Sequence, residues 1–117
     1  MDLQPATPMD HWVGTAGHMN CVNVNLLPPL TTLLIWTRNS LYRLVVLPDS
    51  TVCVQGGVFF PDPTPAELAG ASIRRGFVVD GCICIGLHIE LRAGGTRFIT
   101  SSVVAITIES ARDWITH

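Results

Sequence analysis

The sequence has 117 residues, which is enough for one domain with a thin core and too short for two. Charged residues make up 14% of the chain and the net charge is −2, so the basic excess typical of nucleic-acid-binding proteins is missing. A hydrophobic content of 48% excludes a disordered chain. It also leaves apolar surface exposed once the core is filled, which favours self-association, and we expect a homodimer or a larger homo-oligomer.

The apolar runs are far shorter than a membrane-spanning helix requires, so we expect no contact with a membrane. The N-terminal residues 1–5 lack the basic start and apolar stretch of a secretory signal. We therefore expect a cytoplasmic protein whose four cysteines are reduced. These cysteines are Cys21, Cys53, Cys82 and Cys84.

Residues 1–30 contain four prolines and two glycines and show no sustained periodicity until a weak alternation over residues 21–26. This composition predicts an irregular N-terminal arm that contains at most a short strand. A β domain is expected over residues 31–109, followed by a C-terminal tail at 110–117. Within the domain, short apolar and β-branched runs at 33–36, 41–47, 51–55 and 58–60 predict strands separated by turns.

A helix signal follows at residues 61–70. Thr64 can act as the N-cap, Pro65 occupies the favoured first helical position, and Glu67 completes a capping box. Gly70 can end the helix. The sequence therefore predicts one short helix of one or two turns.

Residues 83–91 show strict alternation, with aliphatic side chains at every odd position. This pattern predicts one long strand whose inner face is Ile83, Ile85, Leu87, Ile89 and Leu91, and we expect Leu87→Ala to cost about 2–5 kcal/mol. A glycine turn at 93–96 and strands at 97–100 and 103–109 follow. The other residues expected to be mostly buried are Phe59, Phe60, Val104, Ile106 and Ile108.

Together these elements predict a mainly β fold, a small antiparallel barrel or sandwich of about six strands with one short helix.

Cys82, Cys84 and His88 would share one face of the predicted strand, and Cys53 lies on the polar face of another. Three cysteines and a histidine form a ligand set that zinc accepts. Positions two apart on a straight strand splay away from each other, however, so the alternative is a pair of buried thiols beside a hydrogen-bonded histidine. No cofactor is predicted, and zinc is retained as the alternative.

No catalytic residue is predicted. Cys84, His88 and Glu90 would stand in a row along a strand instead of converging as a nucleophile, a base and an orienting acid must. The glycine pairs at 56–57 and 94–95 are isolated and lack the spacing of a phosphate loop.

Three polar breaks interrupt the apolar strands at residues 37–40, 73–76 and 100–102. If they meet at one end of the sheet, they form a site for a small anionic or polar ligand, because arginine and hydroxyl groups suit such ligands. The alternative is three separate solvated loops. The candidate ligand-binding residues are Arg38, Asn39, Ser40, Arg74, Arg75, Thr100 and Ser101.

Three short patterns carry a resemblance: Thr-Arg-Asn-Ser-x-Tyr at 37–42, Gly-Gly-x-Phe-Phe-Pro at 56–61 and Ile-Thr-Ser-Ser-Val at 99–103. They resemble a set of small bacterial proteins of unassigned function, over about residues 36–109. The resemblance implies a free-standing bacterial domain of this size and assigns no role to any residue.

The sequence thus favours a non-enzymatic binding or interaction module that associates with itself. The alternative is a metal-binding protein or small enzyme built on Cys82, Cys84, His88 and Cys53. Nucleic-acid binding is disfavoured by the net charge.

Overall fold

The computed structural model describes residues 20–73 and 77–109, which form ten β-strands and one turn of 3-10 helix. The first half of the chain contributes β1 (Cys21–Asn23), η1 (Val24–Leu26), β2 (Thr32–Thr37), β3 (Leu41–Val46) and β4 (Thr51–Gly56). The second half contributes β5 (Phe60–Ile73), β6 (Phe77–Asp80), β7 (Cys82–Cys84), β8 (His88–Ala93), β9 (Thr96–Ile99) and β10 (Val103–Glu109).

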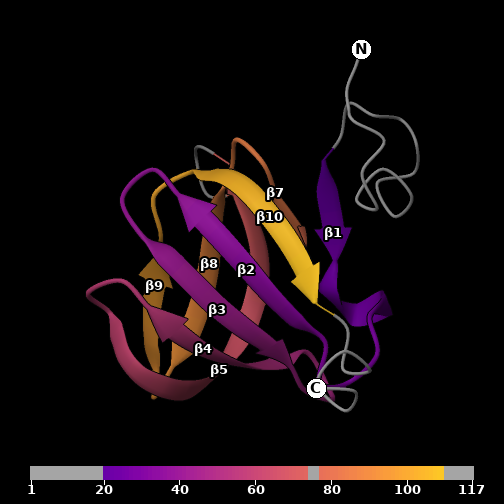
Figure 1. Ribbon diagram of the computed structural model, residues 1–117. Helices are drawn as coiled ribbons and strands as arrows, with labels where there is room; N and C mark the ends of the chain where they lie inside the picture. Colours follow the sequence, from indigo (N-terminus) through magenta and orange to yellow (C-terminus); the bar gives the residue numbers. More distant parts are fainter. Residues whose placement is uncertain (1–19, 74–76, 110–117) are drawn as a thin grey trace.

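The strands form two antiparallel sheets. The large sheet has the order β10-β2-β3-β4-β5-β8-β9, and β6 pairs with β5 beside this path; the small sheet pairs β1 with β7. The large sheet curls, so that β2 and β3 lie in front of β8 and β9 (Figure 1). The predicted mainly β, antiparallel class is confirmed, but the barrel alternative is wrong because the sheet does not close.

Two irregularities in strand pairing, each next to a glycine, allow the large sheet to curl. Between β4 and β5 the register shifts next to Gly56, where the extra residues 61–63 belong to β5; between β5 and β8 it shifts next to Gly70. Both glycines have φ in the positive region, at 140° and 144°, where other residues are strained. A Cβ at either position would overlap the backbone of a neighbouring strand. Bulges of this kind increase the local twist and bend the strand.

The core lies between the two facing parts of the curled sheet. Its largest fully buried side chains come from β2, β3, β4, β5, β7, β8 and β10, and one more comes from η1. Phe60 at the start of β5 packs edge-on against Phe98 of β9, with ring centroids 4.9 Å apart. Phe59 contacts the same ring at 5.2 Å. These rings link the β4–β5 turn to the last strand of the path.

The predicted helix at residues 61–70 is wrong, because this segment is part of the 14-residue strand β5. N–H groups of alternate residues in a strand point to the same edge, so prolines at 61, 63 and 65 remove donors from one edge only. The other edge remains free to pair with β4. Burial then alternates as a strand requires, with Ala66 and Leu68 buried and Glu67 exposed. Pairing with neighbouring strands overrides the local capping signal.

The single strand predicted over residues 83–91 is also wrong. It is divided into β7 and β8 by a turn at Gly86, where φ is 92°. Ile83, Ile89 and Leu91 are buried as expected, whereas Ile85 and Leu87 at the turn are only half-buried. Among the other expected core residues, Phe60 and Ile106 are buried and Ile108 is half-buried. Phe59 and Val104 are exposed.

The N-terminal segment is tied to the domain by a disulfide between Cys21 and Cys84, whose Cα atoms are 4.1 Å apart across the β1–β7 pair. The expectation of four reduced cysteines is therefore wrong. Val22 and Val24 are buried in the core, so this segment closes one side of it. Residues 1–19 of the predicted arm and 110–117 of the predicted tail lie outside the described residues. No helix in the described part of the chain has the length and apolar character to cross a membrane.

The divided strand leads to a prediction for two neighbouring aliphatic residues. Ile89→Ala is expected to lower the free energy of unfolding by about 2–5 kcal/mol, because Ile89 is 1% exposed and its truncation leaves a cavity. Leu87→Ala is expected to cost less than about 2 kcal/mol, because a half-buried side chain loses less contact. Urea titration of both variants measures the difference. Equal losses would mean that the break at Gly86 is absent in solution.

Candidate functional site

Two of the three polar breaks are in contact, which excludes the alternative of separate solvated loops for this pair. The β2–β3 turn at residues 37–40 lies against the β9–β10 connection at 100–102. The backbone N–H of Asn39 donates to Ser101 Oγ at 3.2 Å, and the N–H of Arg38 donates to the carbonyl of Ser102 at 2.9 Å. Arg74 and Arg75 of the third break lie outside the described residues.

The hydroxyl groups in this cluster are occupied by each other and by backbone groups. Ser101 Oγ donates to Thr37 Oγ1 at 2.8 Å, and Thr37 Oγ1 donates to the carbonyl of Ser40 at 3.1 Å. Thr100 Oγ1 accepts the N–H of Ile89 at 3.0 Å and donates to the carbonyl of Ser101. The hydroxyl protons of Thr37, Thr100 and Ser101 therefore already have acceptors, and these side chains join the two connections. The exposed Arg38 side chain is the charged group that the described part of this cluster offers to a ligand.

Tyr42 lies beneath this cluster and is 4% exposed. Burial raises the pKa of its phenol above the ordinary value, and a hydrogen bond with the Ser40 side chain lowers the pKa in part. The Gly57 backbone approaches the phenol oxygen so closely that a Cβ there would overlap it. The phenol is therefore held in the neutral form between two turns.

The structure does not bring together the candidate ligands of the zinc alternative as a group of three or more in its described part. Cys84 is bonded to Cys21, while Cys53 and Cys82 are free and half-buried. His88 Nδ1 lies 2.7 Å from the carbonyl of Thr100, and because a carbonyl only accepts, this nitrogen carries a proton and donates. Within residues 20–73 and 77–109, no group of three or more histidine, cysteine or acidic side chains is arranged to hold a metal ion.

Burial is the main cause that raises the pKa of the Cys82 thiol, and the negative charge of Asp80 raises it further. The thiol is therefore the favoured form of Cys82 near neutral pH, and the reactive thiolate is disfavoured.

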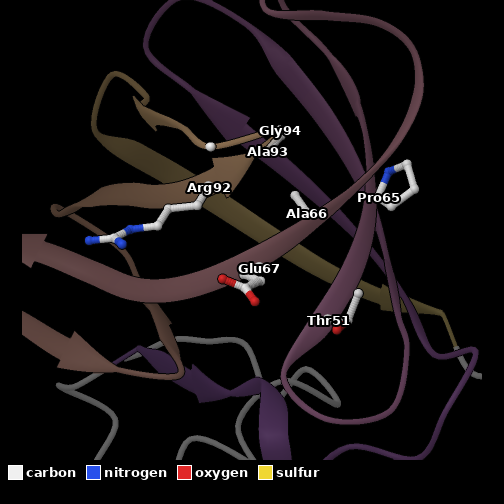
Figure 2. Close-up of a pocket in the computed structure, with 8 residues that line it drawn as sticks. Thr51, Pro65, Ala66, Glu67, Arg92, Ala93 and Gly94 are labelled. Atoms are coloured by element: carbon white, nitrogen blue, oxygen red, sulfur yellow. The ribbon is translucent and has the colours of Figure 1, made fainter.

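A groove that sequence reasoning missed crosses the outer face of the large sheet. It consists of two adjoining hollows of about 490 and 270 Å³ that share Glu67 and Arg92. Thr51, Pro65 and the β8–β9 glycine turn line the larger hollow (Figure 2). The smaller hollow lies between the β3–β4 turn and the end of β6, lined by Asp49, Ser50 and Asp80 among others.

Strand register places the charged groups of the groove in one row. Thr51 of β4 is opposite Glu67 of β5, which is opposite Arg92 of β8. Residues directly opposite in adjacent strands point to the same face, so all three project outward. Figure 2 shows the Glu67 carboxylate and the Arg92 side chain on neighbouring strands at the groove. No ion pair joins these two side chains to each other or to another described residue.

Arg97 continues the same row and has a different role. It contacts Glu90 through two nitrogens, with Nε 3.2 Å from Oε2 and Nη2 3.3 Å from Oε1. Glu90 is 5% exposed, so this pair neutralises a carboxylate that would otherwise be buried alone. Arg97 is therefore paired with Glu90, and Arg92 is the arginine whose charge is available in the groove.

One pattern in the sequence predicts part of the groove. The glycine turn after Ala93 predicts the β8–β9 hairpin, and that hairpin places Arg92 opposite Arg97. The local pattern around Glu67, in contrast, predicts a helix cap. The pairing of Glu67 with Arg92 spans 25 positions and depends on tertiary contacts.

Comparison with protein-family models, curated proteins and solved structures finds no match to this chain. The resemblance to small bacterial proteins therefore stays a prediction.

Tyr42 is the single tyrosine of the chain, so its ionisation can be followed directly. Its folded-state pKa is raised, so the stability that the neutral phenol contributes is fully present below the unfolded pKa of about 10 and is lost as pH rises through the folded value. We expect tyrosinate absorbance to appear at higher pH in folded protein than in urea. Tyr42→Phe should abolish this signal and flatten the alkaline loss of stability. A folded-state titration that coincides with the one in urea would contradict the burial.

Proposed function

We propose that the protein is a non-enzymatic binding module that takes a small zwitterionic ligand in the groove at Glu67 and Arg92. The observation that carries this proposal is the direct opposition of an exposed carboxylate and an exposed guanidinium on β5 and β8, with no ion pair between them. Two opposite charges that point into one groove without neutralising each other suit a ligand that also carries both charges.

The chemistry of the groove points to a basic amino acid as the ligand class. The planar Arg92 guanidinium can bind a carboxylate through two parallel hydrogen bonds. Glu67, Asp49 and Asp80 supply three carboxylates against this one arginine, so a ligand with additional positive charge is favoured. Gly94 and Gly95 have open space where a side chain would be, which lets a ligand approach the backbone closely.

The polar cluster at residues 37–40 and 100–102 supports a binding role over an enzymatic one. The hydroxyl protons of Thr37, Thr100 and Ser101 are donated to backbone or hydroxyl acceptors, and no described histidine is hydrogen-bonded to Ser101. Nucleophilic catalysis would require a serine or cysteine held against a base. The zinc alternative loses Cys84 to the disulfide.

The Cys21–Cys84 bond also bears on the compartment. Disulfides persist in oxidising compartments and are rare in the cytoplasm. We therefore infer an oxidising compartment for the folded, disulfide-bonded protein in place of the predicted cytoplasm.

The groove is tested by ligand-dependent thermal stability. L-arginine and L-lysine are expected to raise the Tm by several degrees at about one hundred times their Kd, where binding adds about 2.7 kcal/mol. Putrescine and succinate, which each carry one kind of charge, should give smaller shifts. Glu67→Gln and Arg92→Gln should each weaken binding about 10- to 100-fold, because each removes a charged hydrogen-bonding partner.

Arg38→Gln is the matched control, since Arg38 is exposed at the far end of β2 and β3 from the groove. It should leave binding unchanged. If Arg38→Gln abolishes binding while Arg92→Gln does not, the ligand occupies the loop cluster. If none of the four compounds shifts the Tm, the proposed ligand class is wrong.

Self-association is the second part of the proposed function, and strand β6 favours it. In the described structure β6 pairs only with β5, so its other edge presents unpaired backbone groups. All four of its side chains are exposed, and Phe77 is 68% exposed. Three of the four are apolar, and no proline or bulge protects this edge, so two copies can pair across a two-fold axis.

Phe77→Asp is expected to convert a dimer to a monomer, because it places a charge on this edge while removing a side chain that contributes little to the core. Val58→Asp is the control, since Val58 is 87% exposed and lies in the β4–β5 turn. Light scattering at micromolar concentration measures the mass. A monomeric wild-type protein, or a dimer that survives Phe77→Asp, would rule out pairing through β6.

A further inference from the structure

One wall of the groove is an unusual turn between β3 and β4. The turn spans residues 48–51 and is closed by the N–H of Thr51, which donates to the carbonyl of Pro48 at 3.2 Å. Its two central residues, Asp49 and Ser50, have φ of 64° and 63°. Turns with two positive φ angles strongly prefer asparagine and glycine at these positions. An Asp-Ser pair is less favourable there, so this turn depends on contacts from outside it.

Two hydrogen bonds hold the turn from outside. The N–H of Leu68 on β5 donates to the carbonyl of Ser50 at 3.1 Å. Ser50 Oγ donates to Asn25 Oδ1 of η1 at 3.0 Å. The second bond connects a groove wall to the N-terminal segment, because Ser50 and the adjacent Asp49 line the smaller hollow.

The disulfide in turn holds η1 in place. Among the described residues, β1 pairs only with β7, over three residue pairs, and one of them is the bonded pair Cys21 and Cys84. The N–H of Val24 donates to the carbonyl of Gly81 at 2.9 Å, directly after Asp80 of the groove. The chain from the disulfide through β1 and η1 therefore reaches both sides of the smaller hollow.

We infer that the Cys21–Cys84 disulfide is a redox switch that sets the affinity of the groove. This inference rests on the proposed function, because the groove must bind a ligand for the switch to matter. With the bond intact, η1 supports the Asp49–Ser50 turn. With the bond reduced, a three-pair strand without a covalent link holds η1 less firmly, and the turn loses its contact with Asn25.

The switching step is reduction by a dithiol. Cys21 is half-exposed and Cys84 is 2% exposed, so the entering thiolate attacks Sγ of Cys21 and Cys84 leaves as the thiolate. The second thiol of the reductant then attacks its own sulfur in the mixed disulfide and releases Cys21. The reductant becomes a cyclic disulfide, and its two electrons and two protons end on Cys21 and Cys84.

Hydrogen exchange tests the coupling without any ligand. Dithiothreitol treatment of the wild-type protein should accelerate exchange of the Val24 and Leu68 amides at least tenfold. The Thr100 amide, which donates to the carbonyl of Ile89 and has no bond to η1 or to the Asp49–Ser50 turn, should be unchanged. Cys21→Ser/Cys84→Ser should reproduce the reduced pattern without reductant. Cys82→Ser, which removes a free thiol of the same strand, should respond to reduction like wild type.

A turn-stabilising variant separates local coupling from a general loss of stability. Asp49→Gly makes the positive φ favourable, so reduction should accelerate Leu68 exchange less in this variant than in wild type. Equal acceleration at Val24, Leu68 and Thr100 would overturn the inference, because the bond would then act on the whole fold. Unchanged Leu68 exchange on reduction would overturn it as well.

L-arginine is the ligand used to test whether the redox state of the disulfide changes the affinity of the groove. Its Kd is expected to rise at least fivefold when the disulfide is reduced. Equal Kd in both redox states would overturn the switch while leaving the groove proposal intact. No binding in the oxidised state would overturn the proposed function, and the exchange data would still decide whether the disulfide controls the turn.

Discussion

The pairing of β5 with three other strands holds the fold together, since removing it would separate the two facing parts of the core. Its first half pairs with β4, and its second half pairs with β8 on one edge and with β6 on the other. The bulge at Gly70 lies in this second half and turns the strand from one part of the curled sheet to the other. The groove crosses the outer face of this strand at Glu67, so the strand that joins the parts of the core also carries the candidate binding site.

Three sets of contacts hold the two facing parts of the sheet together, although its first and last strands do not pair as in a barrel. The ring of Phe98 on β9 packs against Phe60 and Phe59 beside the β4–β5 turn. The hydroxyl cluster joins the β2–β3 turn to the β9–β10 connection through Thr37 and Ser101. The disulfide-linked pair of β1 and β7 covers the remaining side with Val22 and Ile83. Each set of contacts links segments distant in sequence, so their loss would loosen different parts of the same core.

The groove and the polar cluster contain similar side chains in different states. In the cluster, hydrogen bonds within the protein satisfy the hydroxyl groups of Thr37, Thr100 and Ser101, which therefore stabilise the fold. In the groove, Glu67 and Arg92 are exposed and have no described partner, so their charges are available to a ligand. The neighbouring Glu90 and Arg97 differ from Glu67 and Arg92 in the same way, because Glu90 and Arg97 form an ion pair with each other. Whether a side chain already has a partner within the protein, more than its residue type, distinguishes a group that can bind a ligand from a structural one.

The sequence by itself determined the β class, the strands at residues 41–47 and 51–55 and the glycine turn after Ala93, because alternation and turn residues act over a few positions. The polar breaks at 37–40 and 100–102 could be located in the sequence, whereas their contact and their role in joining two connections required the hydrogen bonds. Only the tertiary structure decided that residues 61–70 form a strand, that Gly86 divides the aliphatic run and that Cys21 bonds to Cys84. The same holds for the opposition of Glu67 and Arg92. These features depend on which strands distant in sequence pair and in which register, and turn residues specify that choice only for strands joined by a short turn.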